Sequence, residues 1–164
     1  MEIKVRRALA KAEEYMGIPY SAWRPDVSCY GDHGPFWSYN GPAPSFDRVK
    51  RELLNCVGLI NVVRRDLGLE IPGADEQRYY AGGTYEWFTY LDHKKKLKKF
   101  EPSRIYPDGT LLLRCFRSQE DDGHVAIICG PNQVVHSIRD QGVCRSQIWP
   151  DYYEYVCAPA DWLQ

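Results

Sequence analysis

The sequence has no excess of charge of one sign and no long hydrophobic run. Its 21 lysine and arginine residues oppose 22 aspartate and glutamate residues, for a formal net charge of −1. A balance this even lacks the electrostatic signature of a nucleic-acid-binding protein. The longest apolar runs, such as residues 111–113, are far below the roughly 20 residues of a membrane-spanning helix. Residues 1–14 contain no hydrophobic core of a secretory signal. We expect a cytoplasmic chain with no nucleic-acid partner and no membrane span.

Metal-binding spacings are also missing. None of the six cysteines lies in a C-x-x-C pair, and no two histidines lie four residues apart on a predicted helix. We therefore expect no metal and no other cofactor. A chain of this length can bury a sufficient core without disulfides, so free thiols are expected. Cys115, Cys129 and Cys157 lie in strand-like apolar runs, where cysteine usually packs as a small hydrophobic residue.

Length and composition are those of one globular domain, with 164 residues, 44% hydrophobic and 26% charged. The spacing of apolar residues and the capping residues predict helices over three regions: residues 5–15, 56–67 and 75–100. Asn55 is a favoured N-cap for the second helix, and Gly68 a favoured stop. Arg64 and Arg65 in its last turn would complement the helix dipole. The third region is predicted to break at residues 82–83, with Thr84 as the second N-cap.

An insertion of about residues 24–54 is rich in aromatic residues, proline and glycine. A loop this long and this aromatic is expected to be ordered and packed rather than a linker. Trp23, Trp37 and Trp87, with nearby tyrosines, could stack on a glycan or peptide in a cleft, although packing is the more common role of such residues.

Strands gather at the C-terminal end, over residues 110–116, 124–129, 133–138 and 153–158. Helices followed by strands predict an α+β fold with an antiparallel sheet. The turn at residues 130–132 joins the second and third strands as a hairpin. A turn centred near residue 131 pairs position 124 with about 138, so His124 and His136 are expected to be neighbours on one face.

Cys56 is the candidate nucleophile. It begins a predicted helix, where unpaired N–H groups and the dipole favour an anion, and hence a thiolate. The same N–H groups can donate to a developing oxyanion, and Gly58 would leave room for a substrate. One of His124 and His136 could act as the base while the other sets its tautomer. The alternatives are a merely buried cysteine and two unrelated histidines, or Asp140 in place of His136 if the hairpin register differs.

Several segments, in order, resemble the NlpC/P60 cysteine hydrolases. Residues 55–60 (NCVGLI) are similar to the family motif D-C-S-G-L-V, and residues 17–20 (GIPY) to G-T-P-Y. Downstream, the similar segments are residues 107–112 (PDGTLL, family P-G-D-L-V-F), 123–127 (GHVAI, family x-H-V-G-I) and 134–137 (VVHS, family I-H-A). The order Cys, His, His agrees with unpermuted members and not with the permuted acyltransferase and phospholipase relatives.

The resemblance implies a papain-like α+β fold, with N-terminal helices packed on a C-terminal antiparallel sheet, in a single catalytic domain over residues 1–164. By residue-by-residue correspondence, Cys56 is the nucleophile, His124 the general base and acid, and His136 the orienting group. Tyr20 would line the oxyanion side of the cleft. The implied activity is that of a peptidase or amidase, which cleaves an amide bond in a peptide or peptidoglycan-like substrate through an acyl-enzyme.

Two departures from the motif bear on the substrate. Asn55 and Val57 stand where wall-lytic members carry Asp and Ser, residues that help recognise the peptide stem, so stem-peptide specificity is open. The C-V-G variant and the missing signal and wall-binding repeats resemble phage- or virus-associated members, which implies a cytoplasmic or virion-associated protein. A non-catalytic binding or virion structural domain and a thiol acyltransferase are the alternative functions.

Overall fold

The computed structural model describes residues 1–21, 35–75, 82–118 and 120–164. It contains five helices in the described residues: α1 (Glu2–Glu14), α2 (Phe46–Glu52), α3 (Cys56–Asp66), α4 (Thr84–His93) and α5 (Pro159–Trp162). Six strands form one antiparallel sheet: β1 (Leu97–Lys99), β2 (Leu111–Arg114), β3 (His124–Ile128), β4 (Gln133–Ile138), β5 (Gly142–Gln147) and β6 (Tyr155–Cys157). The α+β class predicted from the sequence is confirmed.

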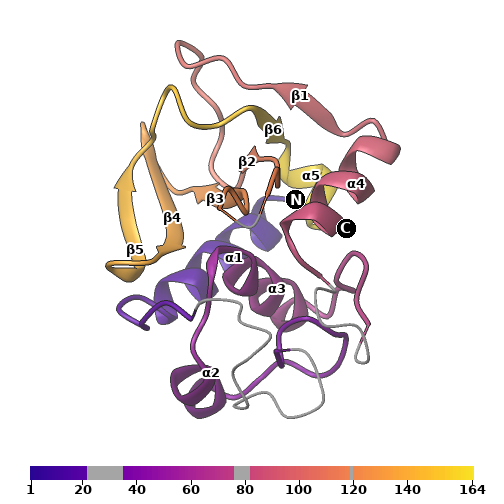
Figure 1. The fold of residues 1–164 in the computed structure, drawn as a ribbon, viewed down its shortest axis with the longest axis vertical. Helices are drawn as coiled ribbons and strands as arrows, with labels where there is room; N and C mark the ends of the chain where they lie inside the picture. The colour runs from indigo at the N-terminus through magenta and orange to yellow at the C-terminus, as the bar shows by residue number, and fades with distance from the viewer. Residues whose placement is uncertain (22–34, 76–81, 119) are drawn as a thin grey trace.

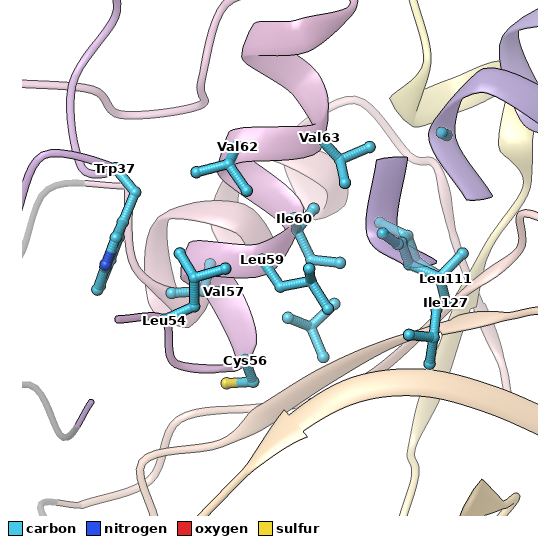
Figure 2. Close-up of a cluster of buried hydrophobic side chains, with 14 of the residues drawn as sticks. Trp37, Leu54, Cys56, Val57, Leu59, Ile60, Val62, Val63, Leu111 and Ile127 are labelled. Atoms are coloured by element: carbon cyan, nitrogen blue, oxygen red, sulfur yellow. The ribbon is translucent and has the colours of Figure 1, made fainter. Parts of the chain in front are cut away.

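The sheet has the strand order β1-β6-β2-β3-β4-β5, and α3 packs against both its β3–β4 region and α1. In Figure 1 the strands occupy the upper half of the view, with β4 and β5 at one edge, and α1, α3 and α2 lie below them. Helix α3 is therefore the central helix of the fold. Figure 2 shows this role, with Trp37 on one side of α3 and Leu111 and Ile127 on the other.

Alternation along the strands divides the core in two. Leu111 and Leu113 of β2 join the large cluster that includes α1 and α3, whereas Leu112 points to the opposite face. That opposite face carries a smaller cluster: Phe100, Leu112, Ala126, Ile128, Val134, Tyr153 and Val156. Both faces of the central strands are thus buried, which explains their nearly continuous apolar sequence.

Arg64 and Arg65 do more than complement the dipole of α3. Both are buried, and each donates hydrogen bonds to three backbone carbonyl groups. The acceptors of Arg64 lie in Glu70, Trp162 and Gln164; those of Arg65 lie in Phe36, Gly41 and Pro42. Such donors satisfy carbonyls that would otherwise be buried without partners. The end of α3 therefore holds the C-terminus and the 36–42 segment in place.

The insertion contains one helix that the sequence interpretation did not predict. Ser45 caps α2 by accepting a hydrogen bond from the Arg48 amide, and Pro35, Phe36 and Trp37 are buried. The part that is described therefore agrees with an ordered, packed segment. The described residues do not include residues 22–34, which contain Trp23, Cys29 and the first part of the insertion. They also do not include residues 76–81 of the third predicted helical region.

Three features of the secondary structure differ from the prediction. Residues 97–99 form strand β1 rather than the end of a helix, because pairing with β6 at the sheet edge outweighs the local preference of the lysine-rich run. Gly83, not Thr84, is the N-cap of α4, and the Thr84 hydroxyl donates to the Asp122 carbonyl at 2.8 Å. Strand β5 was not predicted at all. It alternates in burial but has mixed polarity, and it forms by pairing with β4 along its whole length.

No helix among the described residues is both long and apolar enough to cross a membrane.

Candidate active site

Helix α3 presents Cys56 as its first residue. The Asn55 side chain caps the helix through its Oδ1, which accepts the Gly58 amide proton at 2.7 Å, as the sequence predicts. Asn55 is 5% exposed and Cys56 is 7% exposed. Figure 2 shows Cys56 at the start of α3, with its sulfur directed away from the labelled side chains of the cluster. Cys56 is therefore a nearly buried residue at the margin of the helix, and it belongs to the large core cluster.

The predicted hairpin brings the two histidines together. Ile127 pairs with Val135 and Ile128 with Val134, which is the register expected from a turn centred at residue 131. His124 Nε2 lies 2.9 Å from His136 Nδ1, a hydrogen bond between two buried imidazoles. The predicted contact between the histidines is confirmed.

Ser146 continues this chain of hydrogen bonds. Its Oγ lies 3.0 Å from His136 Nε2, so both nitrogens of the His136 ring have partners. Asp140, the alternative orienting group, is exposed in the turn between β4 and β5. Ser146 could not be found from the sequence because it lies on β5, the strand that carried no clear pattern.

Cys56 lies near the start of β3. Val125 and Val135 belong to the cluster that packs on α3, so the alternating His124 and His136 lie on the opposite face of the sheet. The backbone amide of Val125 nevertheless hydrogen-bonds to the Cys56 thiol and lowers its pKa. Cys56 is thus in contact with the residue that directly follows His124 in the chain.

Burial controls the protonation of all three groups. It raises the pKa of Cys56 to about 12, although the amides of Val125 and of the first turn of α3 favour the thiolate. Burial lowers the pKa of His124 to about 3, assisted by the charge of His136, and lowers that of His136 to about 4. The direction of these shifts opposes the ionised thiol predicted from the helix terminus, because desolvation favours a neutral thiol and a neutral imidazole.

An aromatic wall covers the histidine pair. We give this name to Trp149, Tyr152 and Tyr153, which follow β5. The Trp149 ring stacks on His124 at 6.0 Å and lies 5.0 Å from the His136 ring. Tyr152 and Tyr153 lie 5.9 and 6.1 Å from His124. A negative charge on Cys56 would raise the pKa of both tyrosines, so the aromatic wall lies near Cys56 as well.

The tryptophans that the sequence offers as candidates for stacking in a cleft are not part of the aromatic wall. Trp37 and Trp87 are fully buried, and Trp87 donates to the Asn61 side chain at 2.8 Å, so both pack in the core. Gly58 likewise faces the core, because a Cβ there would lie 2.9 Å from the Trp37 ring. The prediction that Gly58 makes room for substrate is wrong.

The remaining candidate residues have different positions. Tyr20 is half-buried, and its pKa is raised by burial and by the proximity of Cys56 and Asp122, while a hydrogen bond with Arg139 opposes the shift. Arg139 itself approaches Asp122 at 3.6 Å. The Val57 side chain is 1% exposed within the core, so Val57 can meet a substrate only through its backbone. Asn55 uses its side chain oxygen as the helix cap.

No group of three or more metal-ligating side chains occurs in the described part of the chain. The cysteines described there have free thiols: Cys56, Cys115, Cys129, Cys144 and Cys157.

No protein-family model matches the sequence, and no curated protein matches it. Solved structures do match. The P60 domain of an antigen of Mycobacterium avium subspecies paratuberculosis has a TM-score of 0.58 at 14% identity, with 96% of each chain covered. The chain has the fold of an NlpC/P60 domain. The NlpC/p60 domain of the peptidoglycan hydrolase SagA has a TM-score of 0.53 at 17% identity, covering 94% of this chain and 97% of that one.

A third NlpC/P60 structure has a different function. RipD of Mycobacterium tuberculosis, with a TM-score of 0.53 at 17% identity, covers 94% of this chain and 95% of that one. It is described as a non-catalytic NlpC/p60 domain protein adapted to peptidoglycan binding. Since one fold serves both hydrolysis and binding, the function of this chain depends on its own site residues.

Proposed function

We propose that this protein is a cysteine peptidase or amidase that cleaves an amide bond through Cys56, His124 and His136. The proposal is carried by the hydrogen-bonded chain of His124, His136 and Ser146, together with a cysteine at a helix N-terminus whose thiol meets the backbone of Val125, the residue after His124. Burial of two imidazoles costs free energy that their hydrogen bonds to each other and to Ser146 offset. A base linked to a second group that orients it is the arrangement that activates a nucleophile.

The reaction would begin from the neutral pair. As Cys56 Sγ attacks the carbonyl carbon, its proton passes to His124, and His136 stabilises the imidazolium that forms. The first amides of α3 can donate to the developing oxyanion, with Tyr20 on that side of the cleft. His124 then protonates the leaving amine, and the acyl-enzyme remains. Water deprotonated by His124 attacks the thioester, which releases the acid and restores the thiol.

Peptidoglycan stem peptides are the first candidate substrate. This proposal is supported by the shared fold with the domain of a peptidoglycan hydrolase and with a protein adapted to peptidoglycan binding. Asn55 and Val57 replace the family's Asp and Ser, so the recognised peptide is proposed to differ from that of wall-lytic members. We also propose, from the C-V-G variant, a phage- or virus-associated protein that acts in the cytoplasm or the virion.

A non-catalytic binding domain is the second candidate. It is favoured by the raised pKa and low exposure of Cys56, because an inert buried thiol would have the same properties.

Incubation with purified peptidoglycan and with a peptide library, followed by mass analysis of the fragments, tests the two functions. Cys56→Ala and His124→Ala should lose cleavage by a factor on the order of 10² to 10⁴ or more. Cys129→Ala, which removes another free thiol at the end of β3, is the matched control and should retain it. Cleavage that persists in Cys56→Ala contradicts the proposal, and retention on peptidoglycan without cleavage by the wild type establishes the binding function. A product ligated to an added amine would indicate acyl transfer.

A further inference from the structure

We propose that Ser146 is a positioning residue that fixes the tautomers of both histidines, so that His124 keeps Nδ1 unprotonated for the Cys56 thiol. This inference rests on the proposed function for its catalytic meaning, but the tautomers themselves can be measured without any reaction.

The strand register places Ser146 beside His136. His136 pairs with Cys144 across β4 and β5, and Ser146 lies two residues further along β5. Residues two apart on a strand share a face, so Ser146 is the diagonal neighbour of His136 on the histidine side of the sheet. Its Oγ lies 3.0 Å from His136 Nε2 and 3.0 Å from the backbone oxygen of Gln147.

The direction of these hydrogen bonds follows from counting protons. A serine hydroxyl has one proton to donate, a carbonyl oxygen only accepts, and a neutral imidazole carries one N–H. If Ser146 donates to the Gln147 carbonyl, its Oγ accepts the Nε2–H of His136. His136 Nδ1 is then bare and accepts the Nε2–H of His124 across the 2.9 Å contact. His124 Nδ1 is left as a free base.

The opposite arrangement is possible but makes one hydrogen bond fewer. If Ser146 donates to His136 Nε2, both rings reverse, and His124 carries its proton on Nδ1, where it cannot accept one from a thiol. No proton then lies between the Ser146 Oγ and the Gln147 carbonyl oxygen, so these two atoms form no hydrogen bond. The first arrangement uses both short contacts of Ser146 and the second uses only one, so the first is favoured by about the contribution of one hydrogen bond.

The consequence for catalysis is that the base is prepared before substrate binds. The Gln147 carbonyl orients a hydroxyl, the hydroxyl orients His136, and His136 orients His124. Removing the Ser146 hydroxyl would leave the His136 tautomer undetermined, and part of the population would then hold His124 in the form that cannot accept the thiol proton.

Nitrogen-15 NMR of the imidazole rings tests the assignment directly, because protonated and bare ring nitrogens differ in chemical shift. The wild type at pH 7 should show bare Nδ1 and protonated Nε2 on both His124 and His136, assigned with single His→Gln variants. A protonated Nδ1 on His124 overturns the inference, whether or not the protein proves to be an enzyme. Because this measurement uses the wild-type chain, it does not depend on any variant folding.

Variants then test whether Ser146 is responsible. Ser146→Ala should give mixed tautomers and lower the maximal rate of Cys56 acylation by a p-nitrophenyl ester about twofold, because about half of the molecules would lose the competent tautomer, with little change in half-saturation. Ser146→Thr, which restores a hydroxyl, should recover both. Gln147→Ala is the matched control, since it keeps the backbone oxygen. Unchanged tautomers and rate in Ser146→Ala overturn the proposal. Correct tautomers without any Cys56 acylation would refute the proposed function alone.

Discussion

Replacing Asn55 by alanine removes the cap of α3, the helix that begins with Cys56. The Asn55 Oδ1 accepts the Gly58 amide proton at 2.7 Å, and both residues are buried, so no water can replace the lost acceptor. Loss of such a cap costs about 0.5–2 kcal/mol, and the buried amide favours the upper end. For a chain of this size each kcal/mol lowers Tm by about 2–4 °C. We expect Tm to fall by about 4–8 °C in thermal unfolding followed by circular dichroism.

Asn55→Asp is the matched control for this prediction. Aspartate caps helices as well as asparagine, and its charge is favourable at the positive end of the dipole. It should therefore retain most of the stability, although it also restores the residue found in the family motif. If Asn55→Ala unfolds at the wild-type temperature, or Asn55→Asp loses as much as alanine, the side chain is not acting as a cap.

Three further predictions concern the site and its surroundings. The pKa values of His124 and His136 lie below their ordinary value of 6.5 in the folded protein, so the unfolded chain binds more protons as pH falls. The free energy of unfolding measured with urea should accordingly drop by about 2 kcal/mol per histidine from pH 7 to 5, and a flat profile would contradict the burial of neutral imidazoles. Gly123, with φ +76°, would on replacement by alanine carry a Cβ 2.7 Å from the Arg114 carbonyl oxygen, which would displace the start of β3. Gly123→Ala should therefore lower Tm clearly more than Gly17→Ala, because Gly17 has a similar φ of +82° but no atom within 4 Å of the added Cβ. Equal losses of Tm in the two variants would refute the clash. Alkylation of Cys56 by iodoacetamide, followed by peptide mass analysis, should rise about tenfold per pH unit between pH 7 and 10, because its pKa is about 12; a plateau near neutral pH would instead reveal an ion pair.

The helix start and the hairpin register were predictable because short-range rules determine them. An asparagine before an apolar stripe predicts the cap at Asn55, and a short turn at residues 130–132 fixes which residues of β3 and β4 face each other. These two local features bring His124 and His136 together and place Cys56 at the start of α3.

The rest depends on contacts between distant segments. Ser146 belongs to a strand of mixed polarity that is defined by its pairing with β4, and the aromatic wall lies in an irregular segment with no periodic pattern. Gly58 was misinterpreted because its neighbour Trp37 lies 21 residues earlier in the chain. The upward shift of the Cys56 pKa could not be predicted either, since the sequence displays the helix dipole but not the extent of burial that opposes it.

The most direct test of the account is the reaction of the protein with a p-nitrophenyl ester, which needs no knowledge of the natural substrate. Rapid mixing should release about one nitrophenolate per protein in a burst, with the acyl group on Cys56 in peptide mass spectra, and neither should occur in Cys56→Ala. His124→Ala should lose the burst while remaining folded. Absence of a burst in the wild type, or acyl groups spread over Cys115, Cys129 and Cys144, would contradict the claim that Cys56 is an activated nucleophile.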